Sequence, residues 1–350
     1  MSAGHNTRLA LLTAGAFLAL VVPGKTSEPS PSSGTNQLAP APAGNLIAWW
    51  RFDEPSGDVC KDSSGNGLDA SPEPGSGKAL GRAEGLFDRA LILSGQHMLR
   101  VPERPDFRGR QKLSFSAWVK PAGFDPYNEI FRKEDGEQRV LFSFQEKGTI
   151  LSLGLNIGGY LECDAKIDPL EVADGQWHHC AATFDGEWMR VYLDGRLIGK
   201  LNRPGTLTAG GAAPGCIGSG NGTECFQGAM DDLRIYGEAL APAEVLALYR
   251  SGQPGLERFA HEREERLASV YAPGASLAET LACTRAKLLE QHRSEDREAI
   301  NAVAACAKQR HPQDYADFVR ATGLKPADYL QATSASYNIR ETERLLELLL

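Results

Sequence analysis

The sequence predicts an all-β sandwich followed by a small α-helical region. Between residues 45 and 252, short runs of alternating apolar and polar residues are separated by Gly, Asp and Asn. Two Asp-Gly pairs, Asp185-Gly186 and Asp194-Gly195, each lie between two such runs, which is a strong β-hairpin pattern. From residue 253 to residue 350, the apolar residues recur with a helical period instead.

Two segments precede the predicted sandwich. Residues 9–22 are an apolar run as long as the core of a signal peptide, and shorter than the ~20 residues that a spanning helix needs. No clean cleavage site follows, so residues 1–22 are predicted to be either a signal peptide or a short anchor. Residues 23–44, rich in Pro, Ser, Ala and Gly, predict a disordered linker. We therefore expect a secreted or cell-envelope protein, extracellular or periplasmic.

The strand predictions begin with residues 112–120 (KLSFSAWVK). Apolar side chains alternate on one face while Trp118 lies on the other, as in a strand inside a layered structure. Residues 183–200 (TFDGEWMRVYLDGRLIGK) predict three consecutive antiparallel strands, because each Asp-Gly pair allows a tight turn. Further strands are predicted at residues 48–53, 90–93, 139–144, 149–157, 160–163 and 231–236.

The helix predictions begin at Pro242, which suits the first turn of a helix over residues 242–250, and Gly252 suits its end. Ser276 and Glu279 have the spacing of a capping box, which places a helix over residues 277–292. The remaining helices are predicted at residues 295–308, 312–322, 326–332 and 340–350.

Composition and charge narrow the class of protein. The chain is 42% hydrophobic and 23% charged, as in ordinary soluble globular proteins. Its formal net charge of −8 does not suit a broad nucleic-acid surface. We expect no nucleic-acid partner, and membrane contact only through an uncleaved N-terminal segment.

Six sequence phrases occur in the order typical of one family. They are AWWRFDE from residue 48, DSSGNG from 62, LSFSAWVKP from 113, GQWHHCAATFDG from 175, VYLDGRLIG from 191 and FQGAMDDLRIYGEALAPAEV from 226. Because of these six phrases, residues 45–252 resemble the laminin-G-like jelly-roll domains of the concanavalin A-like lectin/glucanase superfamily. The resemblance implies a two-sheet jelly roll of about a dozen strands. Residues 253–350 resemble no family.

The resemblance also implies that the first and last strands lie side by side, with a structural Ca²⁺ near them. The matching oxygen-bearing residues are Asp53, Asp62, Asn66 and Asp231, and Ca²⁺ takes six to eight oxygen ligands. Alternatively, these side chains accept backbone N–H groups at turns and strand ends without any metal. Both interpretations stay open in the sequence.

A catalytic motif of the same superfamily is broken here. Its glycanases carry Glu-x-Asp-x-(x)-Glu on one strand, which aligns two carboxyl groups for a retaining mechanism. The nearest match starts at Glu162 and Asp164, but Lys166 and Ile167 stand where the second Glu is needed. The sequence therefore predicts that the protein is not an enzyme.

Seven cysteines leave at least one thiol outside any intrachain bridge. Cys216 and Cys225 bracket a predicted hairpin tip. Cys283 and Cys306 are expected at the same level on two antiparallel helices. Both pairs are predicted disulfides, with unpaired thiols as the alternative; the state of Cys60, Cys163 and Cys180 is left open.

The predicted function is that of an exported binding or adhesion protein whose sandwich recognises a carbohydrate or a protein ligand. The alternative is a structural or assembly protein, with the sandwich as spacer and the helical region for association; a glycan-active enzyme ranks last. No ligand-binding residue is assigned. Aromatic candidates for sugar stacking, each with a core position as its alternative, are Trp49 or Trp50, Tyr127, Tyr160 and Trp188.

Overall fold

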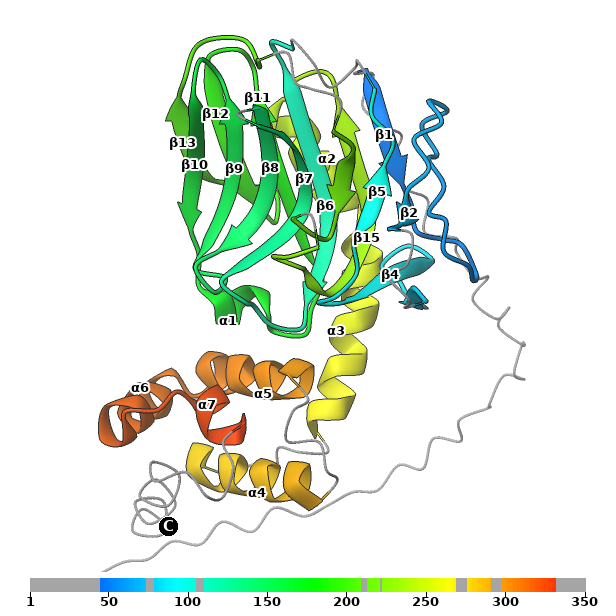
Figure 1. The fold of residues 1–350 in the computed structure, drawn as a ribbon. Helices are drawn as coiled ribbons and strands as arrows, with labels where there is room; N and C mark the ends of the chain where they lie inside the picture. The colour runs from blue at the N-terminus through cyan, green and yellow to red at the C-terminus, as the bar shows by residue number, and fades with distance from the viewer. Residues whose placement is uncertain are drawn as a thin grey trace, which may run out of the picture. The chain divides into compact units, whose positions relative to one another are not determined.

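Two antiparallel sheets face each other as a sandwich, and a set of helices follows them in the chain (Figure 1). This computed structural model describes residues 45–73, 79–104, 110–136, 138–208, 213–220, 222–268, 276–290 and 297–331. The predicted fold class is confirmed. The predictions for residues 1–44 and for a helix over residues 340–350 lie outside the described residues.

The first sheet has eight strands and includes both ends of the sandwich. Its order is β13-β12-β11-β6-β15-β4-β3, and β1 pairs with β15, so the first and last strands are neighbours as expected. Its strands are β1 (Leu46–Trp50), β3 (Gly81–Glu84), β4 (Arg89–Ser94), β6 (Leu113–Pro121), β11 (His178–Phe184), β12 (Trp188–Leu193), β13 (Arg196–Asn202) and β15 (Gln227–Tyr236).

The second sheet has seven strands in the order β10-β9-β8-β7-β14-β5-β2. Four of these, β7 to β10, follow one another as an antiparallel meander. The strands are β2 (Ser71–Pro72), β5 (Leu99–Val101), β7 (Tyr127–Asp135), β8 (Gln138–Gln145), β9 (Ile150–Asn156), β10 (Tyr160–Lys166) and β14 (Gly215–Ile217).

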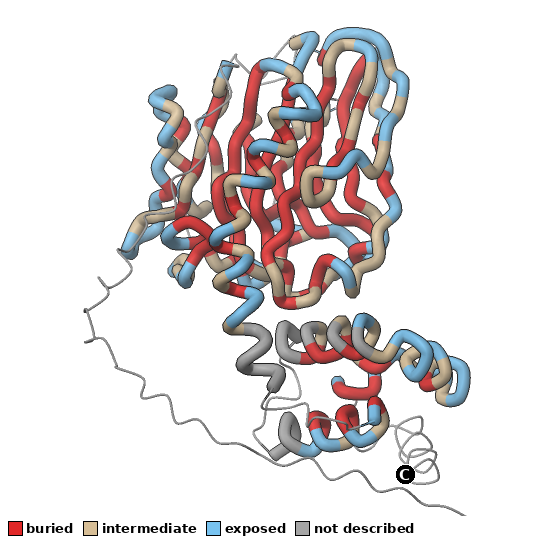
Figure 2. Tube along the Cα trace, turned by 180° about the vertical axis from the view of Figure 1, so that it is seen from behind, coloured by how far each residue is buried: buried red, intermediate tan, exposed pale blue. Residues whose placement is uncertain are grey.

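The main hydrophobic core fills the space between the two sheets. Buried residues run along the strands of both (Figure 2). Phe115 of the first sheet packs against Phe131 and Phe142 of the second, with ring centroids 5.5 and 5.8 Å apart. Aromatic contacts at such distances add to the gain from burial itself.

Helices cover the outer face of the eight-stranded sheet. The helices α2 (Pro242–Ser251) and α3 (Gln253–Ala268) follow each other with only Gly252 between them. Trp118, on the outer face of β6, stacks on Tyr249 of α2, and Trp177 packs against Phe259 of α3. The outer side of the sheet at Trp118 is thus buried beneath the helices and forms a second apolar layer. Gly252 ends α2 as predicted, but α3 begins at the next residue.

The two Asp-Gly pairs form different turns. At the β12–β13 turn, Asp194 has φ 50° and Gly195 has φ 73°, as a two-residue hairpin turn with two positive φ angles requires. At the β11–β12 turn only Gly186 has a positive φ. There the Asp185 carboxylate accepts the N–H groups of Glu187 and Trp188 and holds a longer loop.

The remaining helices are α1 (Pro169–Val172), α4 (Leu277–Glu290), α5 (Arg297–Arg310), α6 (Pro312–Thr322) and α7 (Pro326–Gln331). The predicted capping box is present, since the Ser276 N–H bonds to Glu279 and the Glu279 N–H bonds to the Ser276 hydroxyl. Residues from α4 to α7 form a separate apolar cluster around Leu281 and Phe318. Within the described residues, no helix is long and apolar enough to cross a membrane.

Candidate ligand-binding site

The outer face of the seven-stranded sheet is polar. On β8, Val140, Phe142 and Phe144 pack into the core, so the residues that alternate with them point outward. The register across β7 to β10 places further polar residues on the same side. We call this surface the polar face: Tyr127, Glu129, Arg132 and Glu134 of β7, Arg139, Ser143 and Gln145 of β8, Ser152 of β9, and Tyr160, Glu162 and Asp164 of β10.

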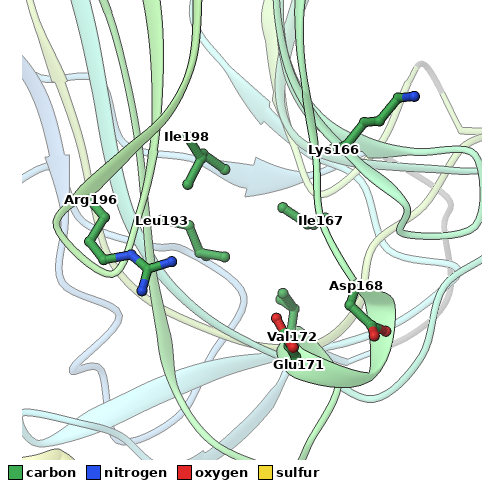
Figure 3. A pocket seen from close by; sticks show the side chains of 8 residues that line it. All are labelled: Lys166, Ile167, Asp168, Glu171, Val172, Leu193, Arg196 and Ile198. Carbon is green, nitrogen blue, oxygen red and sulfur yellow. The ribbon is translucent and has the colours of Figure 1, made fainter.

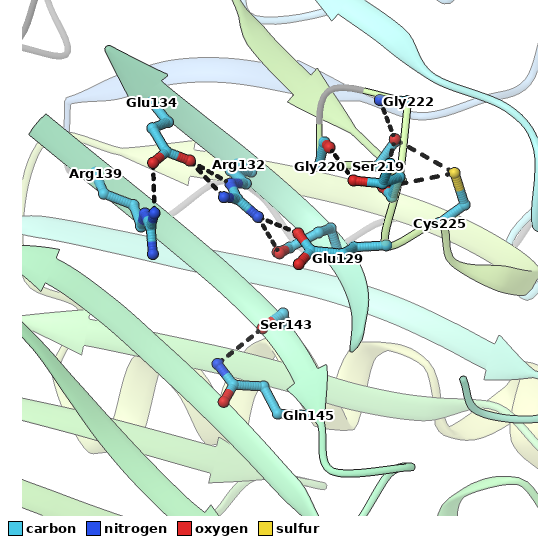
Figure 4. Close-up of polar contacts among 12 residues, drawn as sticks. Glu129, Arg132, Glu134, Arg139, Ser143, Gln145, Ser219, Gly220, Gly222 and Cys225 are labelled. Carbon is cyan, nitrogen blue, oxygen red and sulfur yellow. Dashed lines mark hydrogen bonds and ion pairs between the residues drawn. The ribbon is translucent and has the colours of Figure 1, made fainter. Parts of the chain in front are cut away.

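One end of the polar face is a cluster of charged groups centred on Arg132 (Figure 4). The Arg132 guanidinium contacts Glu129 at 3.1 Å and also pairs with Glu134 and Glu224. Arg139 pairs with the other oxygen of Glu134. Glu224 comes from the loop before β15 and has φ 56°, a left-handed conformation that is uncommon for this residue type.

Glu129 is the unusual member of this cluster. Its side chain is almost fully buried, and its second oxygen, Oε2, has no hydrogen-bond partner among the described residues. Burial raises the pKa of Glu129 to about 8, and the nearby Glu224 charge adds to this effect while Arg132 opposes it. The carboxyl group is therefore mostly neutral at pH 7 and carries a proton that it can donate.

The other end of the polar face lies over β9 and β10. Gln145 of β8 reaches across β9 to donate to Glu162 of β10 at 3.2 Å, and Tyr160 donates to the same Glu162 oxygen. Asp164 accepts from the buried Ser152 hydroxyl at 2.7 Å. At the start of β7, the side chain of Tyr127 is 42% exposed. The face thus combines donors, acceptors and an accessible ring.

Two of the carboxylates on this face, Asp164 and Glu129, stand too far apart for a glycosidase pair. Asp164 lies opposite Ser152, Ser152 opposite Ser143, and Ser143 opposite Glu129, so three strand spacings separate Asp164 from Glu129. Three spacings amount to about 14 Å, whereas glycosidase carboxyl pairs lie about 5–9.5 Å apart.

The sequence did not reveal the Arg132 cluster, because β7 was not predicted as a strand. The pairing of β7 with β8 shifts between Glu129 and Phe131, so Ile130 is an extra residue and breaks the alternation. Ile130 and Phe131 are both fully buried. The only usable signal was the run of charges at Glu129, Arg132 and Glu134.

The residues predicted to bind calcium lie near the β1–β15 pair but bond to protein groups. Asp53 accepts the Arg89 N–H and pairs with Arg51. Asn66 donates to the carbonyls of Leu46 and Ile47.

Asp231 is fully buried and accepts the N–H groups of Leu86 and Phe87. Burial, together with the neighbouring Asp232 charge, raises its pKa. Within the described part of the chain, no three His, Cys, Asp or Glu side chains are arranged to hold a metal ion. Calcium stays a prediction.

Asp62 is expected to stabilise the fold in the absence of metal. Its two oxygens accept the N–H groups of Trp49, Ser64 and Leu68 and the Ser64 hydroxyl. Asp62→Ala should lower the free energy of unfolding by about 2–3 kcal/mol in EDTA, because these donors lose an ionised acceptor. Urea unfolding with EDTA and with calcium measures this. A loss seen only with calcium would instead assign Asp62 to the ion.

Neither predicted disulfide is seen among the described residues. Cys216 and Cys225 are both buried, and Cys225 donates to the Ser219 hydroxyl at 3.3 Å. Cys216 stands on the short strand β14, paired with Arg132 of β7 and Arg100 of β5, so strand pairing rather than a hairpin tip fixes its position. Cys283 is an exposed free thiol, and the side chain of Cys306 lies outside the described residues.

The tryptophans that were candidates for sugar stacking are buried or already contact other side chains of the protein. Trp50 is fully buried. Trp49 donates to Asp232 at 2.5 Å, and the Arg234 guanidinium lies 4.5 Å from its ring. Lys200 lies 5.4 Å from the Trp188 ring. Tyr127 and Tyr160 are the two candidates on the polar face.

The comparison with known families agrees with this topology. Residues 93–246 match the family model described as the concanavalin A-like lectin/glucanases superfamily. The resemblance found in the sequence is therefore confirmed, and the sandwich is a concanavalin A-like jelly roll. No curated protein matches the chain.

Solved structures with a similar sandwich include several binding domains. Domain 4 of AbnA, an extracellular arabinanase from Geobacillus stearothermophilus, in complex with arabinotriose, is 25% identical, with a TM-score of 0.49; the match covers 59% of this chain and 98% of that one. The binding domain of Paraclostridial Mosquitocidal Protein 1 is 16% identical, with a TM-score of 0.48 and coverage of 59% and 52%. The binding domain of botulinum neurotoxin DC, in complex with SialylT, is 13% identical, with a TM-score of 0.45 and coverage of 59% and 52%.

Proposed function

We propose that this concanavalin A-like jelly roll belongs to an exported binding protein and recognises a carbohydrate through the polar face. The observation that carries the proposal is the combination, on one sheet face, of an exposed ring at Tyr127 with dense hydrogen-bonding groups. Sugars present apolar ring faces and hydroxyl groups that both donate and accept, so they need both kinds of partner. The apolar run at residues 9–22 supports export.

The other outer face is a weaker candidate for ligand binding. Helices α2 and α3 already cover it, and Trp118, Trp177 and Tyr249 are packed beneath them. Among the described residues no helix covers the polar face in this way, and Arg139, Asp164 and Tyr127 remain partly or fully exposed.

The charges on the polar face disfavour an acidic sugar. With Glu129 protonated, Arg132 and Arg139 are balanced by Glu134 and Glu224. The other end of the face carries two further acidic groups, Glu162 and Asp164. An acidic sugar needs an uncommitted cation, and both of these guanidinium groups are already paired. Hydroxyl groups can join the existing network without adding charge.

An array of neutral and acidic oligosaccharides tests this proposal. We expect neutral sugars to bind, and Tyr127→Ala to weaken their binding about tenfold through loss of ring contact. Leu197→Ala is the matched control, because Leu197 is 50% exposed but stands on β13 of the other sheet. Equal binding by wild type and Tyr127→Ala would remove the polar face as the site. Failure of all glycans, with capture of an extracellular protein, would favour the protein ligand.

A further inference from the structure

A second candidate site lies at one end of the sandwich, where β10 ends. A cavity of about 240 Å³ opens where β10 runs into α1 and the β12–β13 turn lies opposite (Figure 3). β10 and β13 are the edge strands of the two sheets on this side. The cavity therefore sits at the open end of the space between the sheets.

The inner part of the cavity is apolar. Ile167 and Val172 line it from the β10–α1 segment, and Leu193 and Ile198 from the β12–β13 hairpin. Val172 is fully buried, and the other three are partly buried and pack against the main core. A ligand entering here would remove apolar surface from water, at roughly 25 cal/mol for each Å² buried.

The mouth carries four charged side chains, of which only the cations are uncommitted. The Asp168 carboxylate accepts the Leu170 N–H at 2.9 Å and pairs with Lys308, and Glu171 lies 3.9 Å from the same ammonium. Burial raises the pKa of Asp168, but Lys308 and the Leu170 N–H outweigh burial and lower it overall. Both acids are therefore already partnered.

Lys166 and Arg196 differ from these acids. Both line the cavity and are exposed, and neither makes an ion pair or a side-chain hydrogen bond with any described residue. In Figure 3 they stand on opposite sides of the four apolar side chains. In that view the Arg196 guanidinium is turned toward the apolar side chains, whereas the Lys166 ammonium points away from them. The cavity thus combines an apolar interior with one free cation, Arg196, at its mouth.

We propose that this cavity binds a small carboxylate with a short apolar body. The carboxylate would meet Arg196, and the apolar body would contact Ile167, Leu193 and Ile198. The volume lies below the ~300–1,000 Å³ of pockets for drug-sized ligands, so a chain of a few carbons fits better than an oligosaccharide. This site is independent of the carbohydrate site proposed above.

Hexanoate is the probe, with binding to the full chain measured by saturation-transfer NMR and calorimetry. We expect hexanoate to bind at millimolar or lower concentration, and hexylamine, whose ammonium would meet the Arg196 cation, not to bind. Hexanol should bind several-fold more weakly than hexanoate, because exposed charge pairs contribute modestly.

Single substitutions test whether hexanoate binds in this cavity. Arg196→Gln should weaken hexanoate binding about three- to fivefold. Lys166→Gln, at a side chain whose ammonium points away from the cavity (Figure 3), and Lys200→Gln, on the same strand as Arg196 but outside the cavity, should not. Ile198→Phe should abolish binding by filling the space, with thermal melting used to show that it folds. The proposal fails if hexanoate does not bind at a concentration of about 10 mM, or if hexanol and hexanoate bind equally.

Discussion

Replacing Asp194 with alanine is expected to lower the free energy of unfolding by about 3–5 kcal/mol, because it strands a buried positive charge. The His178 ring lies between two carboxylates, 2.9 Å from Asp194 and 3.1 Å from Asp174. Burial lowers the pKa of His178, but the bonds to Asp174 and Asp194 outweigh it and raise the pKa to about 10. The imidazolium therefore stays charged at neutral pH and needs both partners.

Asp194 also accepts the His179 N–H at 2.9 Å, so two effects must be separated. Asp194→Asn keeps an acceptor for His179 and tolerates the positive φ of this turn, but removes the negative charge. It should still cost most of what Asp194→Ala costs, because the His178 imidazolium loses the same negative partner; the remainder reports on the His179 N–H bond and the turn. Urea unfolding at pH 7 measures both variants. A loss below about 1 kcal/mol for Asp194→Ala would mean that His178 is neutral there, since loss of a buried charge partner costs more than that.

The strands that could be predicted from the sequence are those in which residues facing the core alternate regularly with residues facing outward. In β6, Phe115 packs in the core while Trp118 lies under α2, and the turn at Asp194-Gly195 follows from the φ angles that this pair allows. The strand β7 was missed because the extra residue at Ile130 changes the alternation midway. The short strands β2 and β14 are set by their neighbours, and two or three residues carry no periodicity.

The candidate site could be predicted only in part, because it depends on contacts between distant segments. Tyr127 and Tyr160 were candidates from the sequence alone, whereas Glu224 reaches Arg132 across 92 positions of the chain. Asp62 and Asp231 were chosen for their oxygens, but a sequence cannot show that backbone N–H groups already occupy them. The bridge between Cys216 and Cys225 failed for a similar reason, since strand pairing places Cys216.

The stability of the protein is expected to fall between about pH 4.5 and pH 8 because of Glu129. In the unfolded chain this carboxyl group loses its proton near its ordinary pKa of 4.5, whereas burial raises the folded-state pKa to about 8. Below pH 4.5 both states are protonated and the contribution is fully present. As the pH rises toward 8, the unfolded state releases the proton that the folded state still holds, so the contribution is lost. At about 1.4 kcal/mol for each tenfold change in proton affinity, the loss amounts to about 3–5 kcal/mol.

Glu129→Gln isolates this effect because an amide stays neutral at every pH and still accepts from Arg132. His178 also destabilises the fold as the pH rises, since its pKa is raised to about 10, but it does so equally in both proteins. The difference in unfolding free energy between wild type and Glu129→Gln should therefore change by about 3–5 kcal/mol from pH 4.5 to pH 8, with the variant more stable at the upper end. Urea unfolding at several pH values measures that difference. If it stays constant, Glu129 is ionised at neutral pH, and the Arg132 cluster then carries an uncompensated negative charge, which removes the charge balance on which the choice of a neutral sugar rests.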